Sequence, residues 1–165
     1  MKDKKSYEKA TLTALHVPIE EMMPLIRDKI SSGGSVELNT RGVSMLPMLR
    51  EGRDSVILTA KRGRLKKFDI ALYRRDTGAY VLHRAVKVTE GGYLFVGDAQ
   101  DYYERVRDDS IIAVVTAHKR GGKLMSLTSP RYKLYCFFRY NLRRARRLVL
   151  RLRRKLARAF KKSKK

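Results

Sequence analysis

The sequence predicts a mostly β domain that lies between two helical segments, and three observations support this fold class. Six short segments of strand character follow one another between residues 35 and 120. Turn-forming sequences rich in glycine, aspartate and basic residues separate them. Helical periodicity occurs before and after these segments, in 17–32 and from Ser129 onward. A chain of 165 residues is long enough for one compact domain with an appendage.

A short helix is expected over residues 17–32. Its apolar residues recur on one helical face, at Ile19, Met22, Ile26 and Ile30. Pro18 suits a first helical turn, and the Gly33-Gly34 pair suits a helix end. Pro24 is expected to kink this helix or to divide it in two, because proline lacks the N–H that a helix interior uses.

The domain that contains these strands and the short helix is expected to span residues 17–128, after a polar and loose N-terminus of residues 1–16. Its six strand candidates are 35–40, 54–60, 68–74, 79–88, 93–97 and 110–120. Sequences such as Asp-Thr-Gly and Glu-Gly-Gly supply the turns. A polar stretch after Asp98 separates the last two candidates.

The remaining segment, residues 129–165, is predicted to form a long basic amphipathic helix. Ser129 suits an N-cap, and Pro130 suits the first helical position. Steps of three and four residues place one apolar stripe along the helix, at Tyr135, Phe138, Leu142, Ala145, Val149, Leu152, Leu156 and Ala159.

The charge of the chain predicts an anionic partner. The net charge is +23, of which +16 belongs to residues 130–165. We expect the apolar stripe to enter the boundary of an anionic membrane while the arginines meet the headgroups. Nucleic-acid binding is less favoured, because this tail lacks interleaved stacking aromatics. The third alternative is a solvated basic helix that docks its stripe on the domain or on an acidic partner.

The sequence contains neither a secretory signal nor 18 uninterrupted apolar residues. We therefore expect a cytoplasmic protein, with peripheral attachment to the inner membrane face through residues 130–165. One cysteine, Cys136, excludes an internal disulfide and fits a reducing compartment. We expect neither a cofactor nor a metal.

Two residues carry the candidate chemistry, namely Ser44 and His83. A serine hydroxyl becomes a good nucleophile when a base removes its proton, and histidine is the usual base. Of the three histidines, His16 lies in the polar N-terminus and His118 is expected at the surface beside two basic residues. His83 lies within a strand, on the face opposite to Leu82 and Arg84.

Three elements occur in order: Gly42-Val43-Ser44-Met45-Leu46-Pro47, His83-Arg84, and Gly97-Asp98-Ala99-Gln100. This set resembles the signal peptidase superfamily of serine proteases, which includes the LexA-like self-cleaving repressors. It is most similar to the endoplasmic-reticulum-type signal peptidases, whose general base is histidine. The resemblance covers about residues 34–118. It implies an antiparallel β catalytic domain in which an extended peptide adds alongside a strand.

The resemblance implies that Ser44 is the nucleophile, that His83 is the base and that the Ser44 N–H belongs to the oxyanion hole. Asp98 is the first choice for the carboxylate that orients His83, and Asp108 and Asp109 are its rivals. Four residues are assigned to substrate binding: Gly42 allows close backbone approach, Pro47 stiffens the turn, and Met45 and Leu46 line an apolar cleft.

These residues predict a serine endopeptidase that cleaves a dedicated precursor or leader peptide. A Ser–Lys dyad is weaker, because Lys87 lies several ångströms from His83 along the strand and Arg84 cannot serve as a base. The alternative from another class is a non-catalytic β-scaffold regulator or adaptor that binds anionic membrane or nucleic acid through its basic tail.

Overall fold

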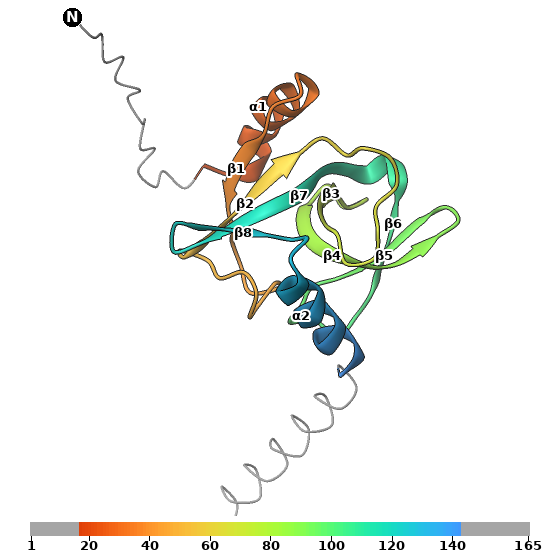
Figure 1. Cartoon of the computed structure of the whole chain (residues 1–165). Helices are drawn as coiled ribbons and strands as arrows, with labels where there is room; N and C mark the ends of the chain where they lie inside the picture. Colours follow the sequence, from red (N-terminus) through yellow and green to blue (C-terminus); the bar gives the residue numbers. More distant parts are fainter. Residues whose placement is uncertain (1–16, 143–165) are drawn as a thin grey trace, which may run out of the picture.

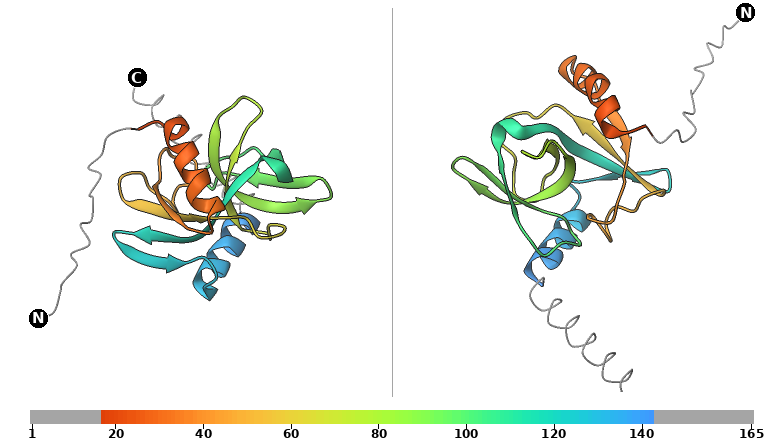
Figure 2. Two further views of the ribbon diagram at one scale, coloured as in Figure 1. Left: turned by 90° about the horizontal axis from the view of Figure 1, so that it is seen from above. Right: turned by 180° about the vertical axis from the view of Figure 1, so that it is seen from behind.

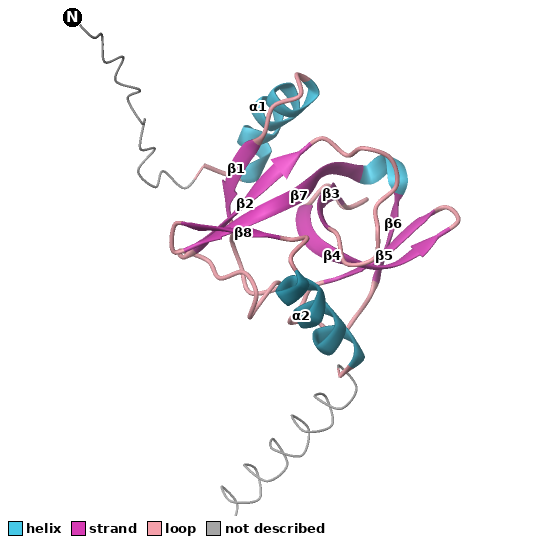
Figure 3. Cartoon of the chain, viewed as in Figure 1, coloured by secondary structure: helices cyan, strands magenta, loops and turns pink. Residues whose placement is uncertain are grey.

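The computed structural model describes residues 17–142 (Figure 1). Two helices, α1 (Ile19–Ser31) and α2 (Pro130–Asn141), accompany eight strands and a short 3₁₀ helix, η1 (Asp108–Ser110). The strands are β1 (Val36–Asn39), β2 (Asp54–Thr59), β3 (Ile70–Arg74), β4 (Tyr80–Thr89), β5 (Gly92–Val96), β6 (Glu104–Arg107), β7 (Ile111–Arg120) and β8 (Lys123–Ser126). The expected mostly β class is confirmed, as the strand colouring of Figure 3 shows.

All strand pairs are antiparallel, and they form one sheet in the order β1-β2-β7-β3-β4-β5-β6, with β8 paired to β7. The long strand β7 connects the β1–β2 side of the sheet with the β3–β6 side. Its first part pairs with β3, and its second part pairs with β2 and β8. The sheet coils strongly, and α1 and α2 lie at opposite ends of it (Figure 2). The register shifts once within each of the β2–β7, β3–β7 and β4–β5 pairs.

The six strands expected from the sequence are present, whereas β6 and β8 were not expected. β6 lies in the polar stretch after Asp98, and its only buried residue is Val106. All four residues of β8 are exposed. Neither segment therefore has an apolar face long enough to predict a strand from sequence alone.

The helix predicted over residues 17–32 is present as α1. α1 continues through Pro24 as one helix and is not divided. It buries Met23, Ile26 and Ile30 against the sheet. Gly33 follows with φ 80°, a left-handed conformation that suits glycine at the end of a helix.

Two apolar cores lie on opposite faces of the coiled sheet, and β3 and β4 contribute to both. Ile70 and Leu72 belong to the first core with α1, β2 and β7, whereas Ala71 and Tyr73 belong to the second core with β5 and β6. Because side chains alternate along a strand, Leu82 packs on the first core and His83 faces the second. The predicted opposition of His83 and Leu82 is confirmed.

Residues 1–16 and 143–165 lie outside the described part of the chain. Of the predicted helix 129–165, the structure therefore describes only α2, in which the Ser129 hydroxyl accepts from the Tyr132 N–H as an N-cap should. Between residues 17 and 142, neither helix has the length and apolar character needed to cross a membrane.

Candidate functional site

Ser44 lies in a compact turn between β1 and β2. Met45, Met48 and Leu49 anchor this turn by packing into the first core. Gly42 begins it with φ 77°, and its N–H donates to Glu51 Oε2 at 2.9 Å. The half-buried Ser44 therefore lies at the rim of a turn that the core holds in place.

The residues predicted to bind substrate divide into two groups. Gly42 and Pro47 are exposed and Leu46 is half-buried, so these three border open space. Met45 is buried in the first core, where it supports the turn instead of offering free surface for a ligand.

His83 is almost fully enclosed, with 1% of its surface exposed. Its Nδ1 lies 3.1 Å from the Tyr73 hydroxyl and 3.4 Å from Glu104 Oε1. Burial lowers the pKa of His83 to about 4, although the charges of Glu104 and Asp98 act in the opposite direction. The imidazole is therefore neutral at neutral pH, which is the form a general base requires.

Glu104, on β6, is a site residue that sequence reasoning missed. Arg75 donates to both of its oxygens, at 2.7 and 2.5 Å, and the Tyr73 hydroxyl donates at 2.9 Å. Partial burial opposes the charge, but the hydrogen bonds from Arg75 and Tyr73 outweigh it and lower the pKa of Glu104. The carboxylate is thus ionised and fixed in place beside His83.

These contacts assign the protons of the network. Glu104 can only accept, and Arg75 can only donate. The Tyr73 hydroxyl donates to Glu104, so its oxygen is left to accept from His83 Nδ1–H. This arrangement places the imidazole proton on Nδ1 and leaves Nε2 as an acceptor, which is the tautomer that can take a proton from a hydroxyl.

Asp98, the first choice for the orienting carboxylate, forms a buried ion pair with Arg84. Both of its oxygens accept from the guanidinium at 2.8 Å, and Tyr135 donates to it at 2.9 Å. Arg84 directly follows His83 and points to the other face of β4. The carboxylate hydrogen-bonded to the base network is therefore Glu104, whereas Asp98 acts on His83 as a nearby charge.

The two rival aspartates have other partners. Asp108 accepts from Lys61 and from the Tyr93 hydroxyl. Asp109 is exposed and lies 3.2 Å from Arg107. Both aspartates are part of η1, and these are the contacts that they make there.

The Ser44 turn is docked on the loop that follows β5. The Ala99 N–H donates to the Ser44 carbonyl at 2.8 Å. Val96, the last residue of β5, pairs with Arg84, so Gly97 follows on the His83 side of that pair. A Cβ at Gly97 would lie 2.7 Å from the Ser44 carbonyl oxygen. Gly97 is thus in close contact with the backbone of the Ser44 turn.

We expect Gly97→Ala to destabilise the protein by about 2 kcal/mol, because the added methyl group would lie 2.7 Å from the Ser44 carbonyl oxygen, which is a backbone atom, and 2.8 Å from the Gln100 side chain. Gly91→Ala is the matched control, since a Cβ there meets nothing within 4 Å. Urea unfolding of both variants measures the difference. Equal stability of the two variants would show that the Ser44 turn does not pack against Gly97.

α2 contacts both the Ser44 turn and the loop that follows β5. Arg139 donates to the Leu46 carbonyl at 3.1 Å and to the Asp98 carbonyl at 2.6 Å. The Arg84 guanidinium donates to Cys136 Sγ and to Met48 Sδ, at 3.1 and 2.9 Å. Helix, turn and loop are therefore linked through buried or half-buried polar contacts.

One edge of β4 is open next to this site. β5 pairs with β4 from Arg84 onward, whereas residues 80–82 pair only with β3 among the described strands. These three residues are half-buried. Their outward N–H and C=O groups can accept an extended peptide that leads towards His83.

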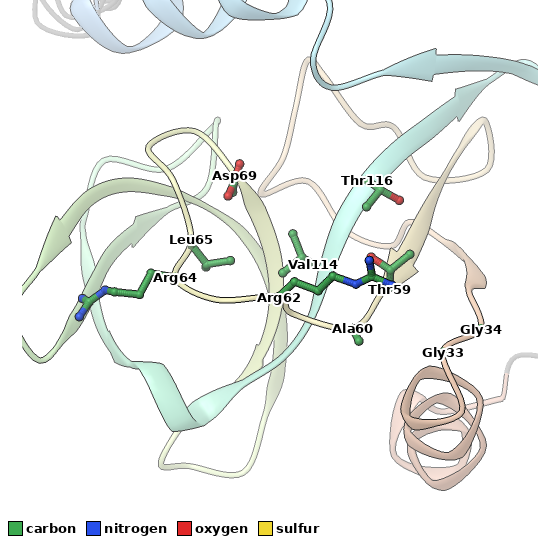
Figure 4. A pocket seen from close by; sticks show the side chains of 10 residues that line it. All are labelled: Gly33, Gly34, Thr59, Ala60, Arg62, Arg64, Leu65, Asp69, Val114 and Thr116. Carbon is green, nitrogen blue, oxygen red and sulfur yellow. The ribbon is translucent and has the colours of Figure 1, made fainter.

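A separate pocket of about 380 Å³ lies between the α1–β1 connection and the β2–β3 connection. Gly33, Gly34, Arg62 and Arg64 contribute to its lining (Figure 4). Neither Ser44 nor His83 lines it. This pocket is therefore distinct from the site assembled around the Ser44 turn.

His118 corrects a further expectation, because it is buried and not on the surface. It pairs in register with Val56 of the first core, and neither ring nitrogen has a hydrogen-bond partner in the described chain. Burial and the charge of Arg120 lower its pKa. Lys119 and Arg120 suggest that the strand has reached the surface at His118. β7 in fact continues as a paired strand to Arg120, so His118 remains buried.

The described residues bring together no group of three His, Cys, Asp or Glu side chains that could hold a metal ion. No family model, curated protein or solved structure matches this chain.

Proposed function

We propose that this protein is a serine endopeptidase of the signal peptidase type, which cleaves a dedicated precursor or leader peptide. The observation that carries the proposal is the network behind His83, in which Tyr73 and Glu104 engage Nδ1 and leave Nε2 as an acceptor. The docking of the Ser44 turn beside Gly97 supports the same conclusion.

In this mechanism, the Ser44 hydroxyl attacks the carbonyl carbon of the scissile peptide bond as His83 Nε2 accepts its proton. The negative charge that forms on the carbonyl oxygen is stabilised by the Ser44 N–H. The C–N bond then breaks, and His83 returns the proton to the leaving amine. A water molecule, deprotonated by His83, hydrolyses the acyl-enzyme and restores the serine.

The open edge of β4 supports a peptide substrate over a small ester. Residues 80–82 can pair with an extended chain along the edge that β5 leaves open. We infer that this pairing presents the next carbonyl of the substrate to Ser44. Gly42, Leu46 and Pro47 border the approach to the turn. We infer that the protein selects its peptide substrates by the substrate side chains that fit between this edge of β4 and the Ser44 turn.

The test is cleavage of candidate precursor peptides by the purified full chain, with products identified by mass spectrometry. Ser44→Ala and His83→Ala are each expected to abolish cleavage at a defined bond. Ser110→Ala and His118→Gln are matched controls, because they change the same residue types away from the site and should retain cleavage. Cleavage that survives both Ser44→Ala and His83→Ala would overturn the proposal and favour a non-catalytic scaffold.

A further inference from the structure

α2 makes many polar contacts with the domain through its inner face, whereas large apolar side chains are exposed on its outer face. The side chains that face the domain are Tyr132, Tyr135, Cys136 and Arg139. They bind Arg84, Asp98 and backbone carbonyls, and the two tyrosines also pack against the first core. Arg84 also lies over the rings of Tyr132 and Tyr135, at 5.4 and 5.8 Å from their centroids. The orientation of the helix is therefore fixed by polar contacts on its inner face.

The outer face of α2 and its C-cap is apolar. Four side chains on it are between 49% and 56% exposed: Leu134, Phe137, Phe138 and Leu142. The rings of Phe137 and Phe138 contact each other edge to face, with centroids 5.7 Å apart. Rotation of the helix to bury these side chains would break the contacts of Arg139 and Tyr135 with the Asp98 loop. The way α2 packs on the domain therefore keeps these four apolar side chains exposed.

Exposed basic side chains accompany this face on α2, and the sequence that follows the helix is basic. Arg131 and Lys133 are exposed on the same helix. The sequence contains no Asp or Glu after Asp109, and residues 143–165 hold 13 Lys and Arg. An apolar face within positive charge complements an anionic bilayer, which offers hydrocarbon and phosphate together.

Nucleic acid would use the charge and could stack on the two phenylalanines. It would leave Leu134 and Leu142 without a role, since these aliphatic side chains have no ring to stack. A bilayer uses all four side chains at once. The composition of the face therefore favours lipid.

We propose that the outer face of α2 docks on an anionic membrane surface. Leu134, Phe137, Phe138 and Leu142 enter the boundary between headgroups and acyl chains, and Arg131 and Lys133 meet lipid phosphates. Because the inner face of the same helix contacts the Asp98 loop and the Ser44 turn, docking places the candidate site next to the membrane.

The chain contains no tryptophan, so a single tryptophan can report on docking in the full chain. Phe138→Trp places it on the proposed face, and Leu25→Trp places it on the exposed side of α1 as a control. Vesicles of mixed phosphatidylcholine and phosphatidylglycerol are expected to shift the emission at position 138 to the blue and to allow quenching by brominated acyl chains. The probe at position 25 should show neither effect. Equal responses at both positions, or no response at position 138, would overturn the proposal.

A binding measurement separates docking by α2 from simple charge attraction. Phe137→Ser combined with Phe138→Ser is expected to weaken co-sedimentation with the mixed vesicles by about tenfold or more, because the variant lacks two rings that would enter the lipid boundary. Leu25→Ser should bind like the wild type, and circular dichroism should show that both variants are folded. Unchanged affinity of the double variant would contradict docking by this face.

Two other occupants give different results. If nucleic acid covers the face, the double variant loses affinity for single-stranded RNA while its vesicle binding is unchanged. If a second copy covers it, emission at position 138 is already shifted without vesicles and returns on dilution, and light scattering gives the mass of a dimer. Either result would overturn the lipid assignment.

Discussion

Glu104→Gln is expected to lower kcat of the proposed peptidase by about 10³-fold or more, because it removes the group that sets the His83 tautomer. Glutamine has nearly the same shape as glutamate, but its amide can donate to the Tyr73 oxygen. The Tyr73 hydroxyl would then donate to His83 Nδ1, and the imidazole proton would move to Nε2. An Nε2–H imidazole cannot accept the Ser44 proton.

The tautomer can be measured without any substrate. Nitrogen NMR of labelled histidine should report an Nδ1–H imidazole for His83 in the wild type and an Nε2–H imidazole in Glu104→Gln. Glu90→Gln, at an exposed position in the β4–β5 turn, is the matched control and should change neither tautomer nor kcat. An unchanged tautomer together with unchanged kcat would show that Glu104 only stabilises the fold through Arg75.

Arg84→Met is expected to lower the free energy of unfolding by about 3–5 kcal/mol, because it leaves a buried carboxylate without its counter-ion. The side chains of Arg84 and Asp98 are only 3% and 2% exposed. The variant also removes contacts that connect β4 to Tyr132 and Cys136 of α2. The expected loss is therefore larger than the contribution of a surface ion pair.

Urea unfolding checks this prediction with two further variants. Arg107→Met breaks an exposed ion pair with Asp109 and should cost less than about 1 kcal/mol. Arg84→Met combined with Asp98→Leu should recover part of the loss, because it removes the unpaired charge as well. A single-variant cost as small as that of Arg107→Met would mean that solvent reaches Asp98 and that the pair does not hold the loop.

The strands that could be predicted are those with an apolar face. β3 and β4 have runs of buried residues, and the sequence places His83 on its correct face of β4 because side-chain alternation is a local property. β6 contains one buried residue, so it could not be recognised, and Glu104 was missed with it. An acidic residue two positions before a lone valine in a basic segment was the only available signal.

Asp98 illustrates the opposite case. Its Gly-Asp motif singles the residue out in the sequence, and the structure shows that it is buried. Its partner could not be deduced, because Arg84 and His83 are neighbours in sequence and point to opposite faces of β4. Which of the two side chains meets the Asp98 carboxylate depends on how the loop after β5 folds back over the sheet.

The sequence by itself determined the mostly β class, the presence of α1 and the start of α2, and the pair of residues on which the proposed chemistry depends. Periodicity, turn formation and charge are local properties, so they can be read along the chain. The tertiary structure decided which carboxylate supports His83 and which face of α2 is exposed. Both depend on pairing between distant strands and on polar contacts such as those of Arg84 and Arg139, which residue spacing does not specify.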